Sequence, residues 1–111
     1  MNNNILSDLD KILSNRKLES TKVSYVAALH AKGLNKILEK VGEECTEVII
    51  AAKDAELTRD SSNLIAETAD LWFHTLIMLS EFGEKSESIL TELERRFHLS
   101  GLEEKASRKS D

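Results

Sequence analysis

Apolar side chains recur three and four positions apart along most of this chain, which is the spacing of one face of an α-helix. The pattern predicts helices over about Asn4–Asn15, from Ser24 to about Glu56, over about Ser62–Phe82 and over about Glu87–His98. No stretch alternates apolar and polar residues as a half-buried strand does. We therefore expect an all-α fold, in which four or five helices of a single domain form a bundle over residues 1–111.

Cap residues and glycines mark the expected helix ends. Ser24 is a suitable N-cap for the second segment, and Gly33 is expected to interrupt or kink that segment, because glycine is a poor helix former. A polar run that ends in Ser62 supplies N-caps for the third helix, and Gly83 is a suitable C-cap for it. The residues from about 100 to 111 are polar and predict a mobile tail.

The third segment is apolar around most of its circumference, so we expect it to be buried on more than one side. Four short helices cannot cover such a helix, which predicts a homodimer that completes the bundle. The side chains expected to face both the chain's own core and a second copy are Trp72, Phe73, Leu76 and Leu79. On the fourth helix, the residues expected to be buried are Ile89, Leu90, Leu93 and Phe97.

Composition narrows the class of protein. Net charge is −5, and no basic cluster occurs outside the C-terminal end, so a nucleic-acid groove is not expected. The longest apolar run, around Leu71–Leu79, is too short to span a membrane. The single cysteine, Cys45, excludes an internal disulfide and a thiolate zinc site. These features predict a cytoplasmic protein.

The second segment places unusual negative charge beside its apolar face. On a helical wheel, Glu43 and Glu47 lie next to the apolar arc and Glu44 lies at its border. One interpretation is a solvated face in which Lys40 and Glu44 pair one turn apart. The apolar arc itself consists of Leu34, Ile37, Leu38, Val41, Cys45, Val48, Ile49 and Ala52.

The third segment carries an acidic stripe without basic neighbours. No Lys or Arg occurs between Ser61 and Glu84, whereas solvated helix faces usually mix both signs. The acidic stripe can therefore hold a cation. The alternative is that it is the one line of a buried helix that faces solvent. The polar residues that share the stripe, which is about 60° wide, are Asn63, Glu67, Asp70, His74 and Glu81.

Two acidic pairs with the same spacing can meet across these helices. Glu44 and Glu47 are three positions apart, and so are Glu67 and Asp70. The short link between the helices makes them antiparallel neighbours. Two carboxylates about 5 Å apart repel by about 3 kcal/mol at an effective dielectric near 20, so a cation is expected between them. Carboxylate oxygens select Mg²⁺ or Mn²⁺, and such sites usually act on phosphates. No Glu-x-x-His spacing of a di-iron bundle occurs. His74, four residues after Asp70, is expected to be a satisfied, partly buried histidine, and the alternative is a contact with the substrate or with a metal ligand.

The acidic motifs also carry a family resemblance. EECTE at 43–47 and ETAD at 67–70 resemble the EExxE…ExxD signature of the all-α nucleoside triphosphate pyrophosphatases, the MazG-like superfamily. The likeness narrows to the phosphoribosyl-ATP pyrophosphatase family in the segments AKGLNKILEKVGEECTEVIIAAKD, ETADLWFHTLIML and LTELERRF. It covers about Leu6–Arg108. The resemblance implies a Mg²⁺-dependent homodimer that hydrolyses phosphoribosyl-ATP to phosphoribosyl-AMP and pyrophosphate, the second step of histidine biosynthesis.

By motif position, the resemblance also implies roles for single residues. The implied metal ligands are Glu44, Glu47, Glu67 and Asp70, with Glu43 as a further ligand or the group that orients the attacking water. Glu43 and Glu47 are the catalytic candidates. The candidates for substrate binding are Lys36, Lys40, Lys53 and Asp54.

Two other functions use the same residues. A house-cleaning pyrophosphatase of the same superfamily would hydrolyse dNTPs or modified nucleotides at the same site. A non-catalytic helical dimer that acts as an adaptor would keep the acidic residues as solvated surface.

Overall fold

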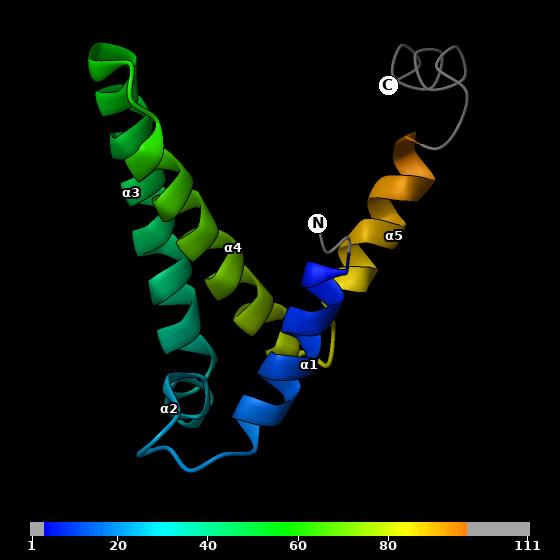
Figure 1. Cartoon of the computed structure of the whole chain (residues 1–111). Coiled ribbons are helices and arrows are strands. Elements are labelled where there is room, and N and C mark those ends of the chain that lie inside the picture. The colour runs from blue at the N-terminus through cyan, green and yellow to red at the C-terminus, as the bar shows by residue number, and fades with distance from the viewer. Residues whose placement is uncertain (1–3, 98–111) are drawn as a thin grey trace.

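The computed structural model describes residues 4–97, which fold into five α-helices without a strand (Figure 1). The helices are α1 (Ile5–Lys17), α2 (Tyr25–Lys32), α3 (Leu34–Thr58), α4 (Ser62–Glu81) and α5 (Ser86–Phe97). The predicted all-α class is confirmed. The tail expected over residues 100–111 lies outside the described residues.

Local sequence explains the break between α2 and α3. The hydroxyl of Ser24 accepts a hydrogen bond from the backbone N–H of Ala27 at 3.1 Å and so caps α2, as predicted. Gly33 then adopts a φ of 96°, a conformation that glycine reaches without strain. The predicted second segment is therefore two helices that meet at Gly33.

A tight turn joins α3 to α4. Arg59 ends α3 in the left-handed conformation, with a φ of 62°. Asp60 Oδ1 then accepts hydrogen bonds from the backbone N–H of Ser62 at 3.0 Å and from its hydroxyl at 2.6 Å. This turn holds the two helices as an antiparallel hairpin.

Gly83 ends α4 as predicted. With a φ of 74°, it lets the Glu84 N–H donate to the Leu79 carbonyl at 2.9 Å and its own N–H donate to the Ser80 carbonyl at 3.1 Å. These two bonds form the Schellman motif, which satisfies the last carbonyls of the helix. The chain can then turn toward α5.

The helices form an open V (Figure 1). The α3–α4 hairpin is one arm, α1 and α5 form the other, and α2 lies at the base against α1 and α3. The radius of gyration is 17.0 Å, whereas a compact chain of about 100 residues has about 13 Å. The core lies where the arms meet and consists of Leu13, Val26, Leu29, Ile37, Leu76 and Ile77.

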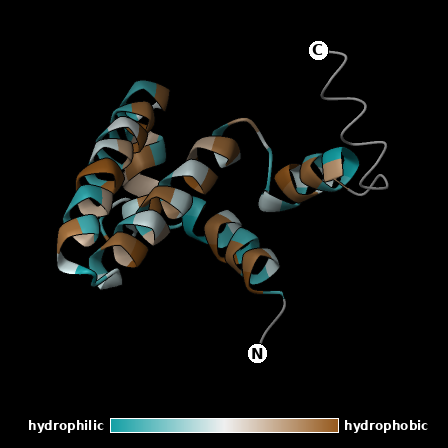
Figure 2. Ribbon diagram, turned by 90° about the horizontal axis from the view of Figure 1, so that it is seen from above, coloured by the Kyte–Doolittle hydropathy of each residue, from teal (hydrophilic) through white to brown (hydrophobic). Residues whose placement is uncertain are grey.

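The burial predicted for the last helix is wrong for the single chain. The apolar residues of α5 (Ile89, Leu90, Leu93 and Phe97) are 44–52% exposed, because the main packing of α5 within residues 4–97 is against a single helix, α1. On α3, Cys45 and Ile49 are also exposed. The buried line of α3 is instead Ile37, Glu44 and Ala51, which recur every seven residues. Figure 2 accordingly shows hydrophobic residues on several sides of the helices.

The third helix of the prediction, α4, is covered on one side only. Leu76 is buried, Phe73 and Leu79 are half-buried, and Trp72 is 59% exposed. None of the helices within residues 4–97 has the length and apolar character needed to cross a membrane.

Candidate metal centre

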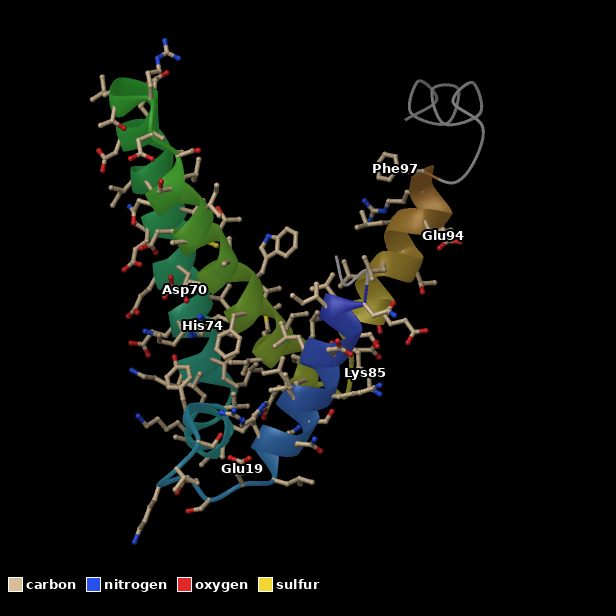
Figure 3. The ribbon with its side chains drawn as sticks, viewed as in Figure 1. Glu19, Asp70, His74, Lys85, Glu94 and Phe97 are labelled. Atoms are coloured by element: carbon tan, nitrogen blue, oxygen red, sulfur yellow. The ribbon has the colours of Figure 1, made fainter. Side chains whose placement is uncertain are left out.

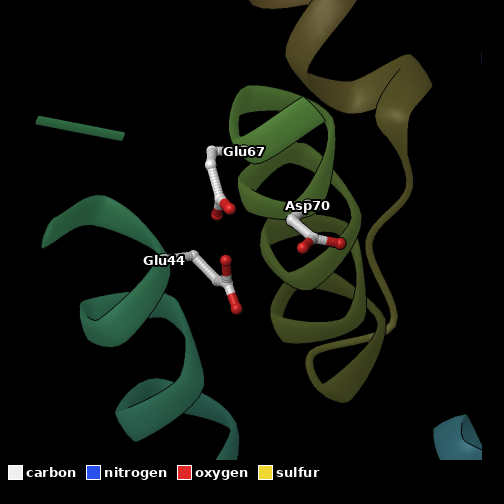
Figure 4. Close-up of side chains that lie close together, drawn as sticks. All are labelled: Glu44, Glu67 and Asp70. Carbon is white, nitrogen blue, oxygen red and sulfur yellow. The ribbon is translucent and has the colours of Figure 1, made fainter. Parts of the chain in front are cut away.

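Three carboxylates converge between α3 and α4 (Figure 4). Glu44 comes from α3, and Glu67 and Asp70 come from successive turns of α4. One oxygen from each of the three side chains lies within 4.8 Å of the others. The spacing of three residues puts Glu67 and Asp70 on the side of α4 that faces α3, as the sequence predicted.

Glu44 is the most buried member of this carboxylate triad. It is 6% exposed and stands in the buried line of α3. Burial and the neighbouring carboxylates of Glu47 and Asp70 raise the pKa of Glu44. The packing of α3 against α4 brings these carboxylates together, so the negative charge is held in place by the fold.

Glu47 lies beside Glu67 but outside the triad. Its carboxyl, with which Glu67 can share a proton, is the first cause of the raised pKa of Glu67, and burial is the second. The side chain of Glu47 is exposed. The structure thus gathers three of the four predicted ligands at one point and places the fourth at the edge.

The triad has the chemistry of a site for a hard cation. Glu44 Oε2 and Glu67 Oε2 are buried and accept no hydrogen bond from any residue between 4 and 97. No ion pair to a triad carboxylate occurs within residues 4–97. Buried carboxylate oxygens without donors are costly. A divalent ion with a preference for oxygen ligands, such as Mg²⁺ or Mn²⁺, would satisfy them.

Comparison with known proteins identifies the family. The family described as phosphoribosyl-ATP pyrophosphohydrolase matches residues 6–97. A curated phosphoribosyl-ATP pyrophosphatase from Hydrogenovibrio crunogenus is 62% identical over 108 residues, which cover 97% of this chain and 96% of that protein. The chain belongs to the phosphoribosyl-ATP pyrophosphohydrolase family. The triad is therefore the candidate active site of a pyrophosphohydrolase.

Two lysines of this pyrophosphohydrolase lie on α3 ahead of Glu44. Lys40 pairs with Glu43 at 3.1 Å, and this bond is the main reason why the pKa of Lys40 is raised. The Lys40–Glu44 pair of the solvated-face interpretation is not among the ion pairs within residues 4–97. Lys36 pairs with Glu39 at 3.6 Å in an exposed position. Lys40 and Glu43 thus form the polar rim of the site on its α3 side.

Lys53 and Asp54 are not brought to the triad. Lys53 follows Glu44 by nine residues, which places it on the opposite side of α3. It pairs with Glu56 at 2.6 Å, and both side chains are exposed. Asp54 is exposed as well. In the single chain, these two residues lie apart from the other candidates.

Tyr25 is a neighbour of the site that the sequence analysis missed. Its hydroxyl lies 2.7 Å from Nε2 of His74, which is one turn from Asp70 on α4 (Figure 3). Nδ1 of His74 lies 2.9 Å from the backbone carbonyl of Asp70. The expectation of a satisfied histidine is thus met. The spacing of residues along one helix could not indicate Tyr25, because Tyr25 reaches the site from α2.

Proposed function

We propose that this chain hydrolyses phosphoribosyl-ATP to phosphoribosyl-AMP and pyrophosphate, the second step of histidine biosynthesis, with Mg²⁺ held by Glu44, Glu67 and Asp70 and with Glu47 as a further ligand. The observation that carries the proposal is the convergence of these three carboxylates in a member of this family. Mn²⁺ offers the same preference for oxygen ligands and is expected to substitute. We expect the reaction to take place in the cytoplasm.

The chemistry follows from the placement of the side chains. When bound, Mg²⁺ would neutralise charge on the phosphate oxygens and lower the pKa of a water. Glu47 and Glu43, at the edge of the triad, are assigned to orient the attacking water and to accept its proton on a carboxylate oxygen. Lys40 and Lys36 are assigned to the phosphate oxygens. Lys40 would then exchange its bond to Glu43 for one to the substrate.

Lys53 and Asp54 remain proposed substrate-binding residues. Because they lie apart from the triad in one chain, they can bind the substrate only if it extends along α3 or if a second subunit brings them to its active site. The open V and the exposed apolar side chains of α4 and α5 support the proposed homodimer, since a second copy would cover them.

A substrate panel with pyrophosphate release as the readout tests the function. We expect turnover of phosphoribosyl-ATP with Mg²⁺, loss of turnover with excess EDTA, and recovery with added Mg²⁺ or Mn²⁺. Turnover of dNTPs without turnover of phosphoribosyl-ATP would instead support the house-cleaning function. An inactive protein that binds neither nucleotide nor metal would support the adaptor.

A further inference from the structure

Tyr25, His74 and Asp70 form a chain of hydrogen bonds that joins α2 to the triad. The Tyr25 hydroxyl meets Nε2 of His74 at 2.7 Å, and Nδ1 of His74 meets the Asp70 carbonyl at 2.9 Å. Rings of Tyr25 and Phe73 flank His74 edge-on, with centroids 5.7 and 5.3 Å from that of His74. The imidazole is therefore fixed both by ring contacts with Tyr25 and Phe73 and by hydrogen bonds at its two nitrogens.

The acceptor at the Asp70 end determines which atom donates in each of these hydrogen bonds. A carbonyl oxygen only accepts, so Nδ1 of His74 must carry a hydrogen and donate to Asp70. In the neutral imidazole, Nε2 is then an acceptor, and the Tyr25 hydroxyl donates to it. One tautomer of His74 thus satisfies both bonds.

His74 is placed to hold the backbone and not to contact a substrate. It is 5% exposed, and both ring nitrogens are engaged by protein groups. The carbonyl to which it donates belongs to Asp70, the exposed member of the triad. Tyr25 anchors the other end on α2, which packs against α3, the helix that carries Glu44. These hydrogen bonds therefore fix the position of the Asp70 turn of α4 relative to α3, the helix that carries Glu44.

We propose that Tyr25 and His74 are positioning residues, which hold the Asp70 turn so that its carboxylate converges with Glu44 and Glu67. This inference rests on the proposed metal site. Groups that orient ligands in this way commonly change metal affinity by about 10- to 100-fold when they are removed. The effect of the pair is thus on ion binding, with substrate contacts unchanged.

The test is Tyr25→Phe, which removes the hydroxyl but keeps the ring beside Phe73. Titration with Mn²⁺ alone, followed by calorimetry, should show about tenfold weaker binding than in the wild type. The Mg²⁺ concentration for half-maximal activity should rise by a similar factor. At saturating Mg²⁺, kcat and the KM for phosphoribosyl-ATP should return close to the wild-type values. Asp70→Asn, which removes a ligand, should not recover in this way.

His74→Asn is the second test variant. The asparagine amide can still donate to the Asp70 carbonyl, but the hydrogen bond to the Tyr25 hydroxyl is lost. If one chain of bonds is responsible, the double variant Tyr25→Phe/His74→Asn should bind Mn²⁺ no more weakly than the weaker single variant. Should His74→Asn fail to fold, Tyr25→Phe alone decides.

Two matched controls separate positioning from general loss of bonds. Thr75→Val removes another side-chain bond to a carbonyl of α4, from Thr75 to Leu71 at 2.7 Å. Glu81→Gln perturbs the other side-chain link between α2 and α4, the one from His30 to Glu81. Both should bind Mn²⁺ like the wild type. Wild-type affinity in Tyr25→Phe, or equal losses in the controls, would overturn the inference. Absence of Mn²⁺ binding in the wild type would overturn the proposed function itself.

Discussion

Glu44 occupies a position on α3 that would ordinarily be apolar, because it lies midway between the buried residues Ile37 and Ala51. Its buried carboxylate oxygen has no donor within residues 4–97, which supports the proposed metal site over a charged surface. Such a group destabilises the metal-free protein and is compensated when an ion is bound.

We expect Glu44→Gln to stabilise the metal-free protein while it abolishes activity. Two carboxylates about 5 Å apart repel by about 3 kcal/mol at an effective dielectric near 20, so the gain after relaxation should be about 1–2 kcal/mol. Activity should fall at least about 100-fold, because the ion contributes several kcal/mol to the transition state. Thermal melting in EDTA and pyrophosphate release measure the two effects.

The control for this variant is Glu39→Gln, on the exposed side of α3. It should change neither melting nor turnover appreciably, since exposed ion pairs contribute little. A Glu44→Gln protein that is active and no more stable in EDTA would contradict a metal-binding role.

The raised pKa values of Glu44 and Glu67 predict a pH dependence. Both lie above the ordinary value of 4.5, so the folded state holds these protons more tightly than the unfolded state. Their contribution to stability is complete below about pH 4.5 and is lost as the pH rises through the raised values. Because Mg²⁺ competes with these protons, the rise in Tm caused by Mg²⁺ should grow over this interval.

Melting curves between about pH 5 and 8, in EDTA and in Mg²⁺, check this dependence. A Mg²⁺ effect of the same size at every pH would argue against buried carboxylate ligands. In Glu44→Gln, the dependence in EDTA should be smaller than in the wild type.

At the scale of elements, α5 is attached to the rest of the chain by its first residue. Asp10 of α1 accepts hydrogen bonds from the Ser86 N–H at 3.0 Å and from its hydroxyl at 2.6 Å. Asp10 therefore acts as a cap supplied from another helix, while most of α5 stays exposed. The hydroxyl of Ser86 also donates to the Leu6 carbonyl at 3.4 Å, so these polar contacts and the packing on α1 orient this arm.

Asp10→Ala should release α5. Loss of a cap costs about 1 kcal/mol, and amides of α5 should exchange with solvent faster while those of α3 are unchanged. Hydrogen exchange followed by mass spectrometry measures this. Asp10→Asn keeps an oxygen acceptor and serves as the control. Equal exchange in all three proteins would show that α5 is held by other contacts.

At the scale of the whole molecule, the open V leaves large apolar side chains exposed on both arms. Exposed apolar surface of this extent indicates an interface. The proposed homodimer predicts a solution mass of twice 12.5 kDa. Leu93→Asp, which places a charge on the apolar face of α5, should shift the protein toward the monomer.

Light scattering after gel filtration distinguishes the two states, with Glu94→Gln on the same helix as the control. A Leu93→Asp protein that remains as associated as the wild type would place the interface elsewhere, for example at Trp72. A monomeric wild type would overturn the dimer.

The sequence by itself determined the helices, their ends and the pairing of acids along each helix. Ser24, Gly33 and Gly83 act through bonds within a few residues, and the interval between Glu67 and Asp70 fixes their common side of α4. These features depend on local geometry, which repeats in every helix. The family resemblance, carried by the same motifs, was likewise confirmed.

Only the tertiary structure decided how these faces meet. The rotation of α3 against α4 buries Glu44 and leaves Glu47 at the edge, and the crossing of α2 brings Tyr25 to His74. The exposure of α5 likewise depends on which helices pack against it, and its main contact within residues 4–97 is with α1. Such contacts join residues far apart in sequence, so they depend on the packing of the whole chain. A helical wheel cannot supply that packing, because it describes one helix without its neighbours.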